Sequence, residues 1–72
     1  MEVRLFATLR TNRDKSVSVA WFDGICGFDI LKTLKIDPKE VATFLVNGKH
    51  EKLDEKLKET DIIAIFPPVG GG

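Results

Sequence analysis

The sequence is poor in the residues that build disulfides, metal sites and catalytic pairs, since it has one cysteine, Cys26, and one histidine, His50. A single cysteine excludes an intramolecular disulfide and a zinc site made of several cysteines, and it fits a reducing cytosol. Basic and acidic residues number 11 each, so there is no electrostatic footprint for nucleic acid. No apolar run approaches a membrane span, and residues 1–4 lack a signal-peptide pattern. We therefore expect a cytoplasmic protein that binds neither nucleic acid nor membrane.

Catalytic signatures are also missing from the 72 residues, which suffice for one small domain. There is no nucleophile–base pair, glycine-rich phosphate loop or metal-ligand cluster. We interpret His50 as a surface residue of a turn or edge strand. Cys26 lies near a predicted helix start, where a thiolate can be stabilised, but we interpret it as a packed structural residue. The sequence predicts a protein that is not an enzyme and that holds no metal or bound cofactor.

Alternation of apolar and polar residues predicts an N-terminal hairpin. The first strand carries apolar residues at every second position, namely Val3, Leu5, Ala7 and Leu9. A polar turn at 11–14 follows, and residues 16–22 alternate again, with Val17 and Val19 on one face. Two alternating runs joined by a turn are typical of a β-hairpin.

The second half of the chain predicts three further strands. Residues 42–46 form the first of them, and the Asn47-Gly48 pair follows at once. This pair is the strongest short hairpin signal, because both central positions of a type I′ turn need positive φ. A short strand should return through 49–52, and the β-branched, apolar residues 61–66 predict the last strand.

Between the two groups of strands, Phe28, Leu31 and Leu34 recur at spacing three, with Ile30 beside them, which predicts a helix over 27–35. One helix among five strands must cover one face of a mixed sheet, which is an α+β arrangement. We predict a β-grasp over residues 1–66, with the first and last strands parallel at the sheet centre. Leu53 and Leu57 should anchor the otherwise solvated charged segment 49–61. The predicted buried residues are Val3, Leu5, Val17, Val19, Phe28, Leu31, Leu34, Phe44, Val46, Ile63 and Ile65.

The same alternation turns other apolar side chains to the opposite, outer face of the sheet. These residues are Phe6, Leu45, Ile62, Ala64 and Phe66. A cluster of this kind favours a docking surface for a partner protein, the alternative being a small secondary core.

The chain ends in Pro67-Pro68-Val69-Gly70-Gly71-Gly72, which predicts a flexible tail over 67–72. The two prolines favour an extended exit from the last strand. Residues 69–72 then span roughly 13 Å at full extension, and the glycines lack side chains that would obstruct a narrow enzyme channel. A frayed terminus or a cloning scar is the alternative interpretation.

The stretch from Asp61 to Gly72 resembles the end of ubiquitin-like sulfur carriers of the MoaD and ThiS families. It is most similar to the small subunit of molybdopterin synthase (MoaD), which typically closes with Phe-Pro-Pro-Val and Gly-Gly. The opening residues 3–7 and Val46-Asn47-Gly48 match that family too. The final glycine triplet is more like the ThiS carriers of the thiamine pathway.

The resemblance implies that a ubiquitin-activating-like adenylyltransferase uses ATP to adenylate the carboxylate of Gly72, next to Gly71. A sulfur donor would convert it to a thiocarboxylate for molybdopterin (molybdenum or tungsten cofactor) biosynthesis. The acceptor would be an enzyme such as the molybdopterin synthase large subunit. Alternatives are a thiamine-pathway carrier, a ubiquitin-like modifier joined to lysines, and a binding module with an inert tail. The resemblance implies that these residues contact partners: Phe6, Leu45, Ile62, Ala64, Phe66, Pro67, Pro68, Val69 and Gly70.

Overall fold

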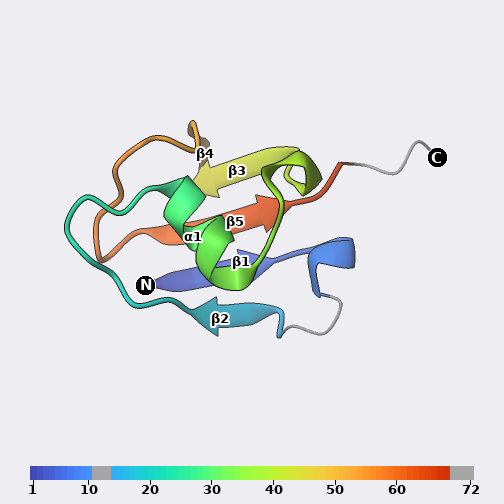
Figure 1. Ribbon diagram of the computed structural model, residues 1–72, viewed down its shortest axis with the longest axis horizontal. Helices are drawn as coiled ribbons and strands as arrows, with labels where there is room; N and C mark the ends of the chain where they lie inside the picture. The colour runs from blue at the N-terminus through green and yellow to red at the C-terminus, as the bar shows by residue number, and fades with distance from the viewer. Residues whose placement is uncertain (11–13, 69–72) are drawn as a thin grey trace.

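A computed structural model of the protein describes residues 1–10 and 14–68, and Figure 1 shows one sheet with helix α1 lying across one of its faces. The elements, with η for a 3₁₀ helix, are β1 (Glu2–Leu5), η1 (Ala7–Arg10), β2 (Ser16–Ser18), α1 (Gly27–Leu34), η2 (Pro38–Glu40), β3 (Thr43–Val46), β4 (Lys49–His50) and β5 (Ile62–Phe66). Within the described residues the strands form a five-stranded sheet in the order β2-β1-β5-β3-β4.

The centre of the sheet is the parallel pair of β1 and β5, in which Val3 lies opposite Ile63 and Leu5 opposite Ile65. Strand β2 pairs antiparallel with β1, and β3 pairs antiparallel with both β5 and β4. This arrangement confirms the predicted α+β, β-grasp fold. Strands β3, β4 and β5 lie within the predicted ranges.

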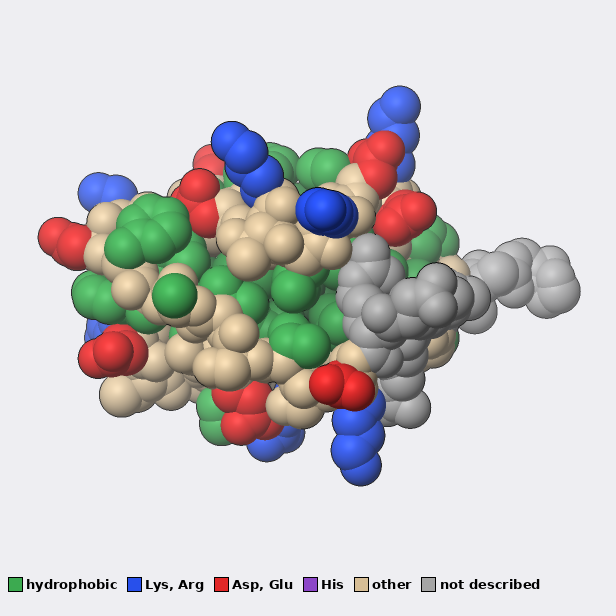
Figure 2. All heavy atoms as spheres, turned by 60° about the horizontal axis from the view of Figure 1, so that its bottom comes forward, with side chains coloured by type: hydrophobic (Ala, Val, Ile, Leu, Met, Phe, Trp, Pro, Cys, Tyr) green, Lys and Arg blue, Asp and Glu red, His purple; other side chains and the backbone are tan. Residues whose placement is uncertain are grey.

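The core lies between the sheet and α1. Its buried residues are Val3, Leu5, Leu9, Val19, Ile25, Ile30, Leu31, Ile36, Phe44, Leu57, Ile63 and Ile65, and Val17, Leu34 and Val46 are partly buried against them. Leu57 is buried and Leu53 partly buried, which confirms that they anchor the charged segment. On the side that carries the β2 edge, Figure 2 shows hydrophobic side chains at the surface among the charged ones.

The predicted burial of Phe28 is wrong, because this side chain is 47% exposed. The buried stripe of α1 runs through Gly27, Ile30 and Leu31, with Leu34 half-buried. Ile30 and Leu31 lie three and four residues after Gly27, and Leu34 lies three after Leu31, so these positions share one helical face. Phe28 lies one residue, or about 100°, away from Gly27 around the helix axis. The small residue therefore occupies the core side of the first turn, and the aromatic residue is left outside.

The first strand is shorter than its alternating pattern predicts. It ends at Leu5, and Ala7 has a φ of 53°, which turns the chain into η1. The Leu9 amide donates to the Phe6 carbonyl at 3.2 Å, and the Leu9 side chain still enters the core. Strand β2 likewise ends at Ser18 rather than at residue 22.

Helix α1 ends at Leu34 with a Schellman motif. Lys35 is left-handed (φ 59°, ψ 42°) and donates its amide to Lys32 O. The Ile36 amide donates to Leu31 O at 2.8 Å, and both of these side chains are buried. This pair of hydrogen bonds satisfies carbonyls at the helix end and explains why Ile36, which the periodicity did not include, belongs to the core.

Candidate docking surface and C-terminal exit

The outer face of the sheet, opposite α1, brings together the five apolar residues predicted for it. We call Phe6, Leu45, Ile62, Ala64 and Phe66 the outer-face cluster. Arg4, Ala64 and Leu45 form one row across β1, β5 and β3, because Arg4 pairs with Ala64 and Leu45 pairs with Ala64. Directly opposed residues of neighbouring strands project on the same face of a sheet. The cluster is therefore continuous across the three central strands.

Two phenylalanines form one end of the cluster. The rings of Phe6 and Phe66 stack with their centroids 4.1 Å apart and their planes 8° from parallel. The Phe6 amide donates to Ile65 O at 3.2 Å, which keeps the end of β1 beside β5. Each ring is half-buried, largely because it covers the other. The stack presents the two rings as one continuous aromatic surface.

The remaining members of the cluster are open to solvent to different degrees. Ile62 is 39% exposed, whereas Leu45 and Ala64 are half-buried. No buried side-chain nitrogen or oxygen in the described part of the chain lacks a hydrogen bond, so the fold does not need a partner to satisfy a polar group here. What the face offers a partner is apolar contact area, with the flat aromatic stack at one end.

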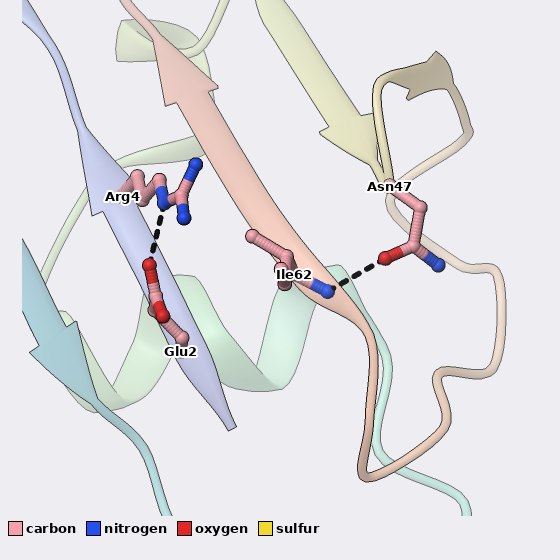
Figure 3. A network of polar contacts seen from close by, with 4 residues as sticks. All are labelled: Glu2, Arg4, Asn47 and Ile62. Carbon is pink, nitrogen blue, oxygen red and sulfur yellow. Dashed lines mark hydrogen bonds and ion pairs between the residues drawn. The ribbon is translucent and has the colours of Figure 1, made fainter.

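Polar contacts at the edge of the cluster hold the start of β5. The Asn47 side chain accepts a hydrogen bond from the Ile62 amide at 2.9 Å (Figure 3), and it donates one to Asp61 Oδ1 at 2.8 Å. Asp61 Oδ2 in turn accepts from the Lys58 amide at 2.7 Å. The Asn47-Gly48 turn has the predicted positive φ at both positions, 54° and 83°. The turn residue thus fixes β5 as well as the β3–β4 hairpin.

The last strand leads from this surface toward the C-terminus. The Ala42 amide donates to Phe66 O at 2.9 Å, which holds the final residue of β5 against the chain before β3. Pro67 is half-buried and Pro68 is exposed. The described residues end at Pro68 and do not include Val69, Gly70, Gly71 and Gly72. The flexibility predicted for these four residues therefore stays a prediction. The chain therefore leaves the sheet directly after the Phe6–Phe66 stack.

The two chemically distinctive side chains lie away from the outer-face cluster or at its margin. The Cys26 thiol is half-buried and donates to Asp29 Oδ2 at 3.4 Å, and the Cys26 amide donates to the same oxygen at 3.0 Å. The bond from the Cys26 amide belongs to a capping box at the start of α1, which agrees with a structural role for this cysteine. His50 is exposed on β4 and pairs with Leu45 in the sheet.

Among the described residues, no group of three or more histidine, cysteine, aspartate or glutamate side chains is arranged to hold a metal ion. None of the helices within residues 1–10 and 14–68 is long and apolar enough to cross a membrane.

The sequence analysis missed the charged residues of the outer face. Glu2 and Arg4 occupy the outward positions of β1, and Arg4 Nε donates to Glu2 Oε2 (Figure 3). The period of two that placed Phe6 outside also placed these two residues there, so the signal was present. Only the register shows that Arg4 lies directly beside Ala64.

The fold, the outer-face cluster and the glycine-rich end define a small ubiquitin-like protein of the class that contains sulfur carriers and protein modifiers. The chain belongs to the ThiS family, whose model matches residues 3–72. No curated protein matches the chain significantly.

Solved structures from three organisms share the fold across nearly the whole chain. SAMP1 from Haloferax volcanii is 26% identical with a TM-score of 0.78, covering 99% of this chain and 97% of that one. A Pyrococcus furiosus protein provisionally assigned as subunit 1 of molybdopterin converting factor is 25% identical with a TM-score of 0.73, covering 94% and 95%. A chain in the complex of subunits 1 and 2 of molybdopterin-converting factor from Helicobacter pylori is 26% identical with a TM-score of 0.64, covering 99% and 96%.

Proposed function

We propose that this protein is a sulfur carrier whose Gly72 carboxylate is activated by adenylation and converted to a thiocarboxylate. The observation that supports this most directly is the family match, which continues through the glycine triplet to Gly72. The position of the exit adds to it, because Pro67 and Pro68 follow β5 immediately beside the Phe6–Phe66 stack. A partner that holds the outer face can thus receive the end of the chain at the same time.

The chemistry proceeds in two substitutions. A carboxylate oxygen of Gly72 attacks the α-phosphorus of ATP, so that an acyl–phosphate bond forms and pyrophosphate leaves. Sulfide, or a donor of equivalent sulfur, then attacks the acyl carbon, a C–S bond forms and AMP leaves. Adenylation is needed because it gives the acyl carbon a good leaving group. The activating enzyme supplies the site for ATP, and the carrier itself contributes the carboxylate and the surface that positions it.

Molybdopterin biosynthesis is the pathway that we propose for the transferred sulfur. The likeness to two proteins of molybdopterin converting factor supports this choice, and one of those structures contains both subunits. The corresponding partner here would be an acceptor enzyme such as the large subunit of molybdopterin synthase. The match to the ThiS family favours the thiamine pathway as the alternative. Supplying each acceptor enzyme with the thiocarboxylated protein and measuring product formation separates the two pathways.

The first test follows the C-terminus by intact-mass measurement. The protein is incubated with the activating enzyme of its own host, ATP and sulfide, and conversion should raise the mass by roughly 16 Da as sulfur replaces one oxygen. Deleting Gly72 should abolish the conversion and preserve the fold, because it withdraws the carbonyl by roughly 3.5 Å from the reacting atoms. Equal pathway activity of the wild type and the deletion variant would show that the tail is inert. The protein isolated from its host serves as control, since its mass shows where the mature chain ends.

Protein modification is a second candidate function, which the likeness to SAMP1 supports; that name abbreviates small archaeal modifier protein 1. The same adenylate would then be attacked by a lysine amine instead of sulfide. Digestion of host protein and mass spectrometry should in that case find peptides joined through isopeptide bonds to Gly72. Finding the thiocarboxylate without such peptides supports the carrier alone.

We also propose that the outer-face cluster is the surface that docks on the activating and acceptor enzymes. Phe66→Ala should weaken binding to the activating enzyme by about 2 kcal/mol, as truncation of an aromatic anchor typically does. Phe28→Ala is the matched control, because it removes the same ring from an exposed position on α1, at the opposite face. Equal affinities of the two variants, measured by calorimetric titration, would place the interface elsewhere.

A further inference from the structure

A cationic side chain of the outer face, Arg4, lies directly beside the apolar area. Arg4 lies between Ala64 of β5 and Ser16 of β2, and Phe6 follows two residues later, just past the end of β1. The Phe6–Phe66 stack therefore lies on one side of Arg4 and Glu2 on the other. A partner that covers Ala64 and the stack must also cover the guanidinium of Arg4.

Only part of that guanidinium has a partner within residues 1–10 and 14–68. Its Nε donates to Glu2 Oε2, and the terminal nitrogens make no further hydrogen bond or ion pair to the described residues. Figure 3 shows these nitrogens on the side of the Arg4 side chain that is turned toward β5. The Arg4 side chain is 51% exposed, so water solvates these nitrogens in the free protein. Glu2 occupies the Nε side of the guanidinium. The side formed by the two terminal nitrogens, which can bind a carboxylate with two parallel hydrogen bonds, remains accessible to a partner.

Docking changes the energetics of this group. Covering the outer-face cluster removes the water, and terminal nitrogens of a guanidinium that are buried without acceptors are strongly unfavourable. We propose that the partner presents an aspartate or glutamate side chain to the terminal nitrogens of Arg4, so that Arg4 selects partners with an acidic group at this position. This inference rests on the proposed docking surface and names the chemistry of the protein that occupies it. The existing pair with Glu2 is too exposed to contribute much to folding, so Arg4 can be changed without loss of the fold.

The experiment measures binding of the carrier to the activating enzyme of its host by calorimetric titration at low and at high salt. Arg4→Gln should weaken binding at least tenfold, and Arg4→Glu should weaken it further through like-charge repulsion. The loss caused by Arg4→Glu should shrink at high salt, since screening reduces the repulsion. Lys32→Glu is the matched control, because it makes the same charge change on α1, which covers the opposite face. It should bind as the wild type does.

A charge exchange then identifies the partner's group. Changing individual acidic residues of the activating enzyme to arginine should yield one variant that restores binding of the Arg4→Glu carrier. Absence of any such rescue across the enzyme's acidic residues would overturn the proposal, as would wild-type affinity of Arg4→Glu.

The design separates this proposal from the proposed function. If Phe66→Ala binds weakly and Arg4→Glu binds normally, the docking surface stands and the acidic partner group is refuted. If both variants bind normally, the outer face is not the interface and both ideas fail. The thiocarboxylate assay is read independently of either result, because it reports on Gly72 rather than on the sheet.

Discussion

Substituting alanine for Gly27 tests how α1 is positioned over the sheet. A Cβ at this position would lie 2.9 Å from Leu53 Cδ2 and from Phe44 Cζ, and 3.0 Å from Leu53 Cα. The side-chain atoms can move by rotation, but Leu53 Cα belongs to the backbone of the segment that receives the Phe28 amide hydrogen bond. The added methyl group must therefore displace either the helix start or this segment.

Two opposing effects determine the size of the change. Alanine in place of glycine stabilises a helix by about 1 kcal/mol. Overpacking by one methyl group costs about 1–3 kcal/mol, and the backbone contact places this case near the upper end. We expect Gly27→Ala to lose about 1–2 kcal/mol of unfolding free energy, which lowers the thermal midpoint by roughly 10 °C in a domain of this size.

Urea denaturation measures the loss, with Trp21 fluorescence and helical circular dichroism as two probes. Trp21 is the only tryptophan and donates its indole N–H to Leu57 O at 3.0 Å, so it reports on the segment beside Gly27. Thr33→Ala on the exposed side of α1 is the control and should be close to neutral. In a Leu53→Ala background the Gly27→Ala change should cost less than it does in the wild type, because the shorter side chain removes one of the three close contacts. A single variant Gly27→Ala as stable as the wild type would refute the close packing deduced here.

Two further changes test the core and the start of β5. Leu31→Asp should prevent folding, because Leu31 is buried against the sheet and an unpaired carboxylate there is very costly. Circular dichroism and gel filtration would detect the unfolded chain. A folded variant would contradict the placement of α1. Asn47→Ala should lower the unfolding free energy by about 1–3 kcal/mol, since it removes the bonds to Asp61 and the Ile62 amide and leaves alanine with a positive φ. Asn47→Gly also lacks the side chain, but glycine adopts a positive φ without strain. Its urea midpoint relative to the wild type therefore gives the side-chain contribution, and the difference between the two variants gives the contribution of backbone strain in the turn.

The strands were predictable because their signals are local. An alternation of two is visible in a few residues, and Asn47-Gly48 is a turn signal by itself. The end of β1 was not predictable in this way. Ala7 continues the alternation, and an alanine in the sequence does not indicate that its φ will be 53°. Hydrogen bonds that close η1 and the packing of Leu9 determine where the strand ends.

The burial of helix residues depends on contacts that are distant in sequence. The spacing of three between Phe28, Leu31 and Leu34 predicts that Phe28 is buried. In the structure Gly27 occupies that side of the helix, because Leu53 and Phe44 approach too closely for a larger residue. Leu53 is 26 positions away from Gly27 in the sequence, so the periodicity of residues within α1 cannot reveal this contact.

The same contrast explains why the outer-face cluster could be named before its geometry was known. A strand has two faces, so assigning Ile63 and Ile65 to the core leaves Ile62, Ala64 and Phe66 no other position than the outer face. The side chains of a helix point in all directions around its axis, and successive residues are rotated by about 100°. A correct core assignment for Leu31 therefore does not decide whether Phe28 is buried. What alternation cannot supply is the neighbour on the next strand. The register gives Arg4 its importance, because it places the guanidinium beside Ala64, where a partner that covers Ala64 also removes water from the charge. Register, more than composition, therefore determines what a partner of this face must offer.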